Sequence, residues 1–447
     1  MRLPKEVLLV GDDTAGFLTG LGIGFKALEW EVQIVGPEHP FNYSRDSNST
    51  QASESRGRGR TKLEKVKRLL SRLGFSNSPW GTSGWCCGRS PNRMVRVIMR
   101  LPSALFLLSR KDLVLYNSGA TITGSRLEMP IARLLGVKVV SCFHGTDIRP
   151  AYLNGAWLSR ANSDPESIRS AVNQQIKLAR DAERYSNMIV AWSGITHFLR
   201  GNVYLHEQLG FPSVLQHHLR DLSIEGKRAD GRARLVVLHM PTNRSGKGTD
   251  LILSTLEGLQ SDDNRLDVRL VEGLSHQEAI CEIAESDLVV DQVYSDSAAG
   301  VLASEASVLG KPVVVASKDR AWIANLLGSD LPATYFIETS ALKEELMKLI
   351  ENESLRRDAA ALGAAYFLNR WDPTTVASNY VDILFGDGWI NPYSAQQLTA
   401  ARGGFAPPQT LCEVVSAFVA EYGLSALRLD DNPKLKESVV REFLKVP

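Results

Sequence analysis

Short apolar runs alternate with helix-like runs along most of the chain. In the C-terminal half, strand-like runs cover residues 235–239, 268–271, 287–291 and 312–316, with helix-like runs between them. Short apolar strands separated by helices are typical of βαβ units, which build parallel sheets. We therefore predict a parallel α/β sheet here, with 312–316 as the fourth strand of the pattern.

The N-terminal half repeats this alternation. Its strand-like runs cover residues 6–10, 31–35, 112–116, 137–142 and 188–191. A chain of 447 residues is too long for one ordinary hydrophobic core. The pattern and the length together predict two Rossmann-like α/β domains.

Composition indicates where the domains end. The stretch 221–234 is polar and reads as a linker. We predict a first domain over residues 1–222, a second over 223–371, and a crossover helix with an appended helical tail over 372–447.

The loop after the 235–239 strand combines glycines with cations. Arg244 and Lys247 stand beside Gly246 and Gly248, directly before a helix-like run. Glycine lets the backbone approach a ligand, and a helix start offers free N–H groups and a positive dipole end. This combination suits a phosphate or diphosphate. A solvated turn with incidental surface charge is the alternative interpretation.

Glu305 has an unusual position, because it lies in the otherwise apolar helix-like run 301–309 that leads into a buried strand. A buried carboxylate needs a partner that donates hydrogen bonds, and a ribose diol is a suitable donor. Pairing with a nearby lysine such as Lys311 is the other interpretation.

A second polar loop follows the apolar 137–142 strand. It carries His144, Asp147 and Arg149, and Gly145 gives access to the backbone. We expect this loop to face a cleft between the domains and His144 to belong to the site. Arg149 either binds an anionic acceptor group or pairs with Asp147.

Five segments together resemble retaining glycosyltransferases of the GT-B fold. They are residues 129–150, 239–250, 271–279, 287–292 and 304–314. The family is glycosyltransferase family 4, or "glycosyl transferases group 1", with sucrose-phosphate synthase-like and phosphatidylinositol mannosyltransferase-like members. The resemblance implies two Rossmann-like domains facing a central cleft. It also implies transfer of a sugar from a nucleotide-diphosphate sugar on the second domain to an acceptor on the first, with retention of configuration.

The resemblance also implies roles for individual residues. The catalytic candidates are His144, which would contact the transferring sugar or the acceptor hydroxyl, and Arg244 and Lys247, which would hold the diphosphate. The donor-binding candidates are Asn243, Gly248, Glu272, Ser297, Ala299, Gly300, Val301 and Glu305. The acceptor-binding candidates are Thr14, Ala15, Gly16, Asp147 and Arg149. Ser297 stands where the family usually has the first of two paired glutamates.

Other cofactors and reactions fit the sequence less well. Gly11, Gly16 and Gly20 do not form the GxGxxG fingerprint of a dinucleotide site, which argues against a dehydrogenase. We expect no cofactor and no metal, since Arg244 and Lys247 can replace a cation at the diphosphate. Two rivals stay open: a nucleotide-sugar epimerase of the same fold, and a non-catalytic nucleotide-binding scaffold.

Charge and cysteine content bear on partners and location. A net charge of +1 gives no global field for nucleic acid, and five scattered cysteines fit a cytoplasmic protein. Residues 62–73 form a basic amphipathic helix that could rest on anionic lipid at the inner face of the cell membrane, or simply pack against its domain. A lipid-linked or polysaccharide acceptor would suit that location. Residues 42–92 and the last roughly sixty residues show no other recognisable motif.

Overall fold

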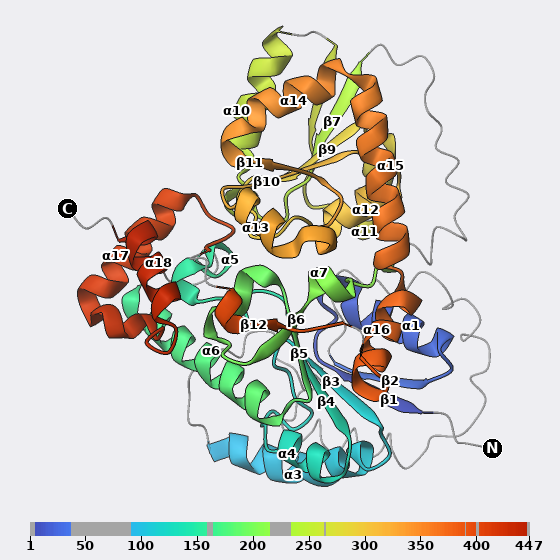
Figure 1. Ribbon diagram of the computed structural model, residues 1–447, viewed down its shortest axis with the longest axis vertical. Coiled ribbons are helices and arrows are strands. Elements are labelled where there is room, and N and C mark those ends of the chain that lie inside the picture. The colour runs from blue at the N-terminus through green and yellow to red at the C-terminus, as the bar shows by residue number, and fades with distance from the viewer. Residues whose placement is uncertain are drawn as a thin grey trace.

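The structure is a computed structural model that describes residues 5–36, 91–158, 164–214, 234–262, 265–388, 390–398 and 402–444. Two lobes lie one above the other, and a small group of helices sits beside the lower lobe (Figure 1). The predicted basic helix 62–73 and all but the last residue of the predicted linker 221–234 lie outside the described residues. Among the helices of the described ranges, none combines the length and the apolar composition needed to cross a bilayer.

The N-terminal lobe is built on a seven-stranded sheet in the order β12-β6-β5-β4-β3-β1-β2. Its strands are β1 (Glu6–Val10), β2 (Glu31–Val35), β3 (Leu113–Asn117), β4 (Lys138–Phe143), β5 (Met188–Ala191), β6 (Asn202–Leu205) and β12 (Tyr393–Ser394). Strands β1 to β6 pair in parallel, and β12 adds an antiparallel edge from the far end of the chain. The five predicted strands of this sheet are confirmed, while β6 and β12 were not predicted.

Alternate residues of each central strand pack against opposite helix layers. Val7 and Leu9 belong to the core formed with α1 (Phe17–Ala27) and α16 (Pro373–Phe385). Leu8 and Val10 belong to a second core formed with α3 (Pro91–Leu108) and α4 (Glu128–Leu134). Burial on both faces explains why this strand is apolar throughout instead of alternating.

The C-terminal lobe contains a five-stranded parallel sheet in the order β11-β10-β9-β7-β8. Its strands are β7 (Leu235–His239), β8 (Leu266–Leu270), β9 (Leu288–Gln292), β10 (Val313–Ser317) and β11 (Tyr335–Glu338). The predicted strand 312–316 is confirmed as β10, while β11, which pairs outside it, was not predicted. Strand β11 (YFIE) has only three apolar residues before Glu338, so its apolar pattern is too short to stand out in the sequence.

Helices cover both faces of this second sheet. One layer consists of α10 (Thr249–Asp262) and α14 (Leu342–Glu351), whose leucines share a core with β7, β9 and β10. The other consists of α11 (His276–Glu285), α12 (Val301–Val308) and α15 (Glu353–Arg370). Both lobes are therefore Rossmann-like, as predicted.

Each sheet reverses its strand order beside its first strand. In the N-terminal lobe β2 and β3 flank β1, and in the C-terminal lobe β8 and β9 flank β7. Ligands of open α/β sheets bind in the crevice beyond the carboxyl ends of the strands at such a reversal. A ligand site is therefore expected at the loops that begin at Gly11, Met240 and Val293.

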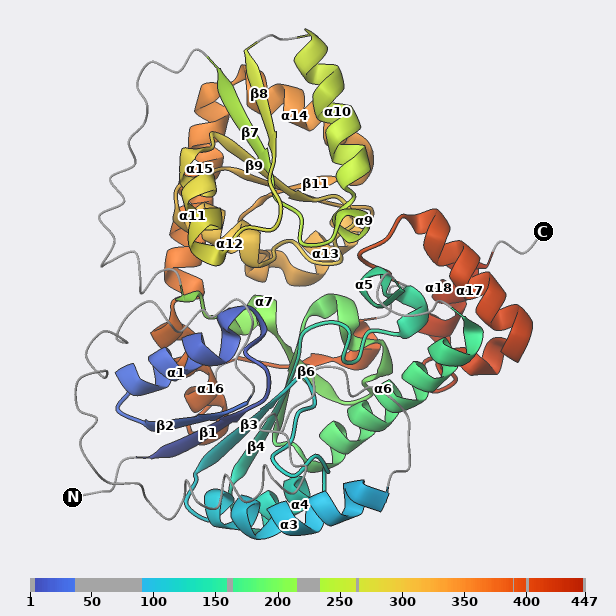
Figure 2. The same ribbon diagram turned by 180° about the vertical axis from the view of Figure 1, so that it is seen from behind.

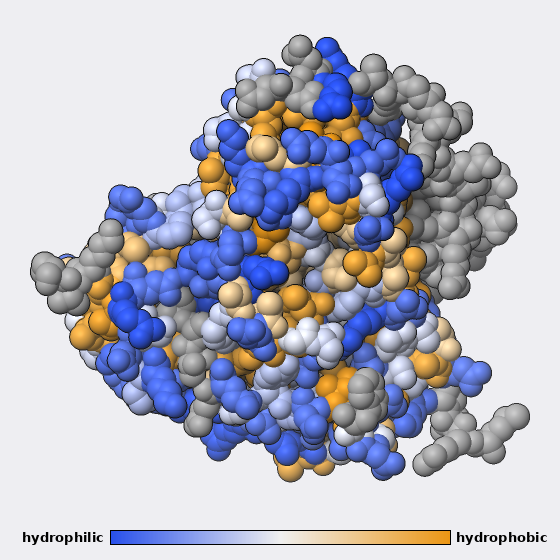
Figure 3. All heavy atoms as spheres, turned by 45° about the horizontal axis from the view of Figure 1, so that its top comes forward, coloured by the Kyte–Doolittle hydropathy of each residue, from blue (hydrophilic) through white to orange (hydrophobic). Residues whose placement is uncertain are grey.

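The end of the chain returns to the N-terminal lobe. Helix α16 packs along α1, so the prediction that this helix crosses back is confirmed (Figure 1). Helices α17 (Pro408–Tyr422) and α18 (Pro433–Phe443) then lie beside α6 (Pro165–Tyr185). Figure 2 shows α5 (Gly155–Leu158) of the N-terminal lobe close to α9 (Arg244–Lys247) of the C-terminal lobe, and the two are in contact. Apolar residues follow part of the boundary between the lobes in the space-filling view (Figure 3).

The close packing of α1 on α16 depends on Gly24. A Cβ atom added there would lie 1.9 Å from the carbonyl oxygen of Pro373 and 2.8 Å from Cβ of Ala377. We expect Gly24→Ala to lower the free energy of unfolding by roughly 1–3 kcal/mol, since overpacking forces the helices apart.

Gly258→Ala on α10 is the matched control, because a Cβ atom there meets nothing within 4 Å. It should be neutral or stabilising, as alanine favours a helix more than glycine does. Urea denaturation measures both variants. Equal stability of Gly24→Ala and Gly258→Ala would contradict the described packing.

Candidate functional site

The loop after β9 brings an open helix N-terminus to the reversal point of the second sheet. Gly300 is the N-cap of the eight-residue helix α12, its backbone is extended, and no side chain caps it. The first N–H groups of a helix have no partner within the helix. They carry partial positive charge and attract anions, so this position suits a phosphate group. Ala299 and Val301, also predicted donor contacts, flank Gly300.

Lys247 and Gly300 both lie close to the side chain of Asp291. The Lys247 ammonium donates to Oδ1 of Asp291 at 2.5 Å, and Asp291 is fully buried at the end of β9. Oδ2 of Asp291 has no hydrogen-bond partner, and it lies 3.5 Å from where a Cβ atom of Gly300 would stand. A buried carboxylate oxygen without a donor is costly. A hydroxyl of a bound ligand would satisfy it.

Two further donor candidates shape the loop that carries Lys247. Asn243 caps α9, where its Oδ1 accepts a hydrogen bond from the backbone N–H of Gly246 at 2.7 Å. Gly248 ends α9 with φ at 74°, and a Cβ atom there would lie 2.3 Å from Cγ2 of Val293. Only glycine fits this left-handed, crowded position without strain.

Arg244 lies at the rim of the site with another donor candidate, Glu272. Its guanidinium donates through two nitrogens to the Glu272 carboxylate, the shortest bond being 2.7 Å. These hydrogen bonds hold the pKa of Glu272 below its ordinary value. Both side chains are exposed, so the pair exchanges readily with solvent or an anionic ligand.

Glu305 is buried on α12 and pairs with His276 at the start of α11. Its Oε1 lies 2.7 Å from Nε2 of His276. Lys311, the lysine partner that the sequence suggested, donates to the backbone oxygen of Ser286 at 2.7 Å. The partner of the Glu305 carboxylate is therefore an imidazole of the same lobe and not the suggested lysine.

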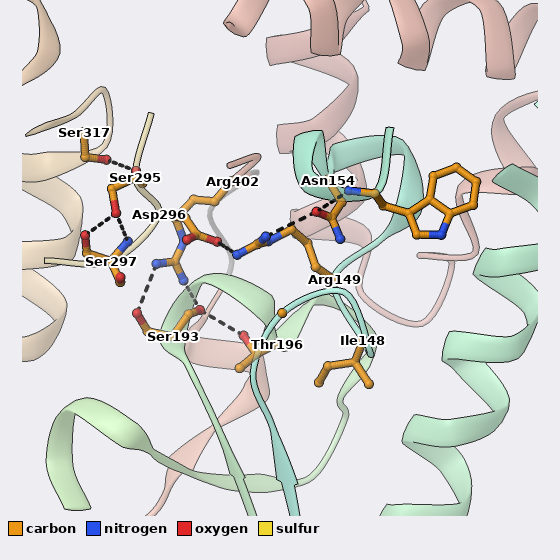
Figure 4. A network of polar contacts seen from close by, with 12 residues as sticks. Ile148, Arg149, Asn154, Ser193, Thr196, Ser295, Asp296, Ser297, Ser317 and Arg402 are labelled. Carbon is orange, nitrogen blue, oxygen red and sulfur yellow. Dashed lines mark hydrogen bonds and ion pairs between the residues drawn. The ribbon is translucent and has the colours of Figure 1, made fainter. Parts of the chain in front are cut away.

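The side chains of Ser297 and Asp296 bind different parts of the protein. The Ser297 hydroxyl donates to the backbone oxygen of Ala299 at 2.9 Å, so it shapes its own loop. Asp296 accepts a bond from Nη2 of Arg149 at 2.5 Å, across the boundary between the lobes (Figure 4). The side chains of this pair are only 5% and 4% exposed.

The Asp147 carboxylate is bound by backbone N–H groups of its own loop. Its carboxylate accepts backbone N–H bonds from His144, Gly145 and Ile148 at 2.8, 2.8 and 2.9 Å. The suggested pairing of Arg149 with Asp147 is therefore wrong. Arg149 reaches past its own loop to the other lobe.

His144 connects the loops that follow β1, β3 and β4. Its Nε2 lies 2.5 Å from Oδ1 of Asn117, and Nδ2 of Asn117 donates to the backbone oxygen of Asp12 at 2.7 Å. A carbonyl oxygen only accepts, so Asn117 must turn its oxygen toward His144, and Nε2 of His144 carries the proton. Nδ1 is then an acceptor, and it is buried without a hydrogen-bond partner. Burial lowers the pKa of His144 to about 3, so the ring is neutral near pH 7.

The acceptor candidates of the first loop form a tight turn before α1. Ala15 and Gly16 both have left-handed backbones, with φ at 53° and 76°. Asp13 places its carboxylate on the start of α1, where it accepts from the N–H groups of Leu18 and Thr19 at 2.7 and 3.1 Å. The position that would bind a dinucleotide phosphate already holds this carboxylate, which agrees with the argument against a dehydrogenase.

The structure thus places two of the predicted residues, Lys247 and Gly300, at Asp291. His144 belongs to a separate cluster with Asn117 in the other lobe. Neither Asn117 nor Asp291 was predicted. Each is a polar residue at the carboxyl end of an apolar strand, which is the signal that could have found it.

Comparison with known proteins finds similarity of fold and no similarity of sequence to a known family. No known protein family and no curated protein matches the sequence. Among solved structures, sucrose-phosphate synthase of Thermosynechococcus elongatus is 12% identical, with a TM-score of 0.44 over 85% of this chain and 98% of that one. UDP-GlcNAc 2-epimerase of Neisseria meningitidis, bound to UDP-GlcNAc, is 14% identical, with a TM-score of 0.40 over 86% and 100%. HepE of Anabaena, in complex with UDP and glucose, is 15% identical, with a TM-score of 0.41 over 85% and 99%.

Two Rossmann-like lobes with a returning C-terminal helix make the GT-B architecture. That prediction is confirmed by the two parallel sheets and by α16. Within the described ranges, no three His, Cys, Asp or Glu side chains are grouped to hold a metal ion. The expectation that the donor needs no metal stays a prediction.

Four histidines predict how stability depends on pH, because burial lowers the pKa of each. The pKa of His144 and of His197 falls to about 3, that of His206 falls well below its ordinary value, and that of His239 is also lowered. Below about pH 6.5 the unfolded chain therefore binds protons that the folded chain does not, and stability falls as pH decreases. Each such histidine contributes about 1.4 kcal/mol per pH unit in this range.

His206→Phe should reduce this slope by about 1.4 kcal/mol per pH unit, because it removes one titrating ring. Phenylalanine suits the position, since the His206 ring lies among Phe17, Trp192 and Phe211. Burial raises the pKa of Glu207 to about 7, which acts in the opposite direction. The slope of the unfolding free energy against pH is therefore compared between the variant and the parent protein, by urea denaturation from pH 7 to pH 5. Identical slopes in the two proteins would show that His206 titrates normally.

Proposed function

We propose that the protein is a retaining glycosyltransferase that takes a sugar from a nucleotide-diphosphate sugar. The observation that supports this most is the open N-terminus of α12 beside Lys247 and the unpartnered oxygen of Asp291. Positive charge for a diphosphate and an acceptor for a sugar hydroxyl meet at the reversal point of the second sheet.

In this proposal the donor lobe stabilises the leaving diphosphate. Lys247 would exchange Asp291 for a phosphate oxygen, and the N–H groups of α12 would face the charge that grows as the sugar leaves. Arg244 would exchange Glu272 for phosphate in the same way. Glu305 would accept bonds from the ribose hydroxyls.

The N-terminal lobe would hold the acceptor. Nδ1 of His144 is an unpartnered acceptor suited to a hydroxyl group. Because its pKa is near 3, the imidazole is a weak base that orients the hydroxyl without removing its proton. The proton would pass to the leaving diphosphate. Closure of the cleft would exclude water and favour the acceptor over hydrolysis.

The acceptor and the location are proposed on the sequence alone. The basic run 62–73 supports a cytoplasmic enzyme on the inner face of the cell membrane. A lipid-linked or polysaccharide acceptor, and hence a role in polysaccharide biosynthesis, would suit such an enzyme.

One observation favours a nucleotide-sugar epimerase as the second candidate. Arg149, the predicted contact for an anionic acceptor, is paired with Asp296 and covered by the ring of Phe405. A site closed there suits a reaction on the nucleotide sugar alone. Conversion of the nucleotide sugar without any acceptor would identify an epimerase, and binding without turnover would identify a scaffold.

A thermal-shift screen against UDP, GDP, ADP and their common sugar conjugates tests nucleotide binding. A ligand that binds only the folded state raises the melting temperature. We expect one diphosphate to give a selective rise. A cooperatively melting sample that responds to none of them would contradict the proposal.

Lys247→Ala and Glu305→Ala should each weaken binding of that diphosphate by at least about tenfold, since each removes a charged hydrogen-bonding group. Lys348→Ala is the matched control, because this lysine pairs with Glu344 and Glu345 on the outer face of α14. Calorimetric titration measures all three. Unchanged affinity in both site variants would place the nucleotide elsewhere.

A further inference from the structure

A five-residue segment, 402–406, connects the two lobes through its backbone. The N–H of Gly404 donates to the oxygen of Leu153 at 3.2 Å, and the N–H of Gly155 donates to the oxygen of Gly404 at 2.9 Å. The next residue, Phe405, donates its N–H to the oxygen of Tyr294 at 3.0 Å. Leu153 and Gly155 belong to the N-terminal lobe and Tyr294 to the C-terminal lobe. Adjacent peptide groups of this segment therefore bind opposite sides of the boundary.

Arg402 makes the same connection with its side chain. It is 1% exposed, and its guanidinium donates to the backbone oxygen and the hydroxyl of Ser193 in the N-terminal lobe. The same guanidinium lies over the ring of Trp322 in the C-terminal lobe, 4.0 Å from its centre. A buried cation is stable only with such partners.

Two arginines flank Asp296 at this point. Figure 4 shows Arg149 and Arg402 on either side of its carboxylate. Arg149 makes the ion pair, and Phe405 lies over the Arg149 guanidinium, 5.0 Å from ring centre to Cζ. The segment 402–406 thus covers the Arg149 side of its ion pair with Asp296.

The appended helices contact both lobes, but they pack differently on the two sides. On the N-terminal lobe the ring of Tyr152 stacks on Phe418, and its hydroxyl donates to the oxygen of Leu427 at 2.9 Å. On the C-terminal lobe Lys318 pairs with Glu442 of α18, and a cavity of about 560 Å³ lies between Gly403, Leu411 and the residues opposite them. Incomplete packing lowers the cost of opening the contact on this second side.

We propose that residues 402–406 are a clasp that holds the two lobes together, with the Arg402 side chain joining Ser193 of the N-terminal lobe to Trp322 of the C-terminal lobe. Opening of the clasp on the C-terminal-lobe side would uncover Arg149 and allow the lobes to separate. The consequence for acceptor entry rests on the proposed function, whereas the clasp itself does not.

Two variants disturb the clasp in different ways. Arg402→Ala removes the bonds to Ser193 and the contact with Trp322. Gly155→Ala changes no charge, but its added Cβ atom would lie 1.7 Å from the backbone oxygen of Phe405 and must displace the segment. Gly258→Ala again serves as the control, since its Cβ atom meets nothing within 4 Å.

Hydrogen exchange read by mass spectrometry on the full chain, without nucleotide, tests the proposal. In both clasp variants we expect peptides that contain Gly404 and Phe405 to exchange at least about tenfold faster than in the parent, with the core strands β1 and β7 unchanged. Small-angle X-ray scattering should show a larger radius of gyration in both, and neither change in the control.

Unchanged exchange and radius in Gly155→Ala would overturn the clasp. This variant decides the matter even if Arg402→Ala loses protection throughout the core. Because no nucleotide is present, the result is separate from the binding screen. A working clasp in a protein that binds no nucleotide would refute only the proposed function.

Discussion

The need to satisfy the start of α12 is the constraint on which the site depends. Its N-terminal N–H groups have no side-chain cap, and the neighbouring buried carboxylate of Asp291 has one oxygen without a partner. The fold places the partly positive start of α12 close to this carboxylate, whose other oxygen accepts from Lys247. The buried oxygen without a donor is the costly element, and a ligand hydroxyl would satisfy it while the α12 N–H groups suit phosphate oxygens.

The second constraint is the burial of charge between the lobes. Arg149, Asp296 and Arg402 come from three distant parts of the chain and are all nearly inaccessible to solvent. Removing one partner of such a cluster leaves an uncompensated buried charge, so the cluster specifies one relative placement of the lobes. The ion pair with Asp296 and the ring of Phe405 keep Arg149 from an anionic ligand. If Arg149 binds an anionic acceptor, as proposed, then closing the lobes and admitting that acceptor are opposing demands on one set of residues.

Local patterns were sufficient to predict much of the fold. Strands β1 and β2 match their predicted bounds because apolar runs between turn residues are strong signals, and both Rossmann-like lobes followed from them. Strand β11 has only three apolar residues in a row and the antiparallel edge β12 has two residues, which is too little for such a signal.

The site was predicted only where sequence neighbours act together. In the loop from Asn243 to Gly248, the capping asparagine and the left-handed glycine are close in the sequence. The local sequence is therefore enough to indicate the shape of this loop. The partners of Arg149 and Glu305 lie 147 and 29 residues away, and no local pattern could identify them. Arg402 lies in a glycine-rich stretch, and only the folded chain shows that it is buried at the lobe boundary.

A crystal structure of the protein with the nucleoside diphosphate that the thermal-shift screen selects tests the central claim most directly. We predict the diphosphate at the N-terminus of α12 within reach of Lys247, and the ribose beside Glu305. A nucleotide bound elsewhere, or at this place without contact to Lys247 and the α12 N–H groups, would contradict this claim.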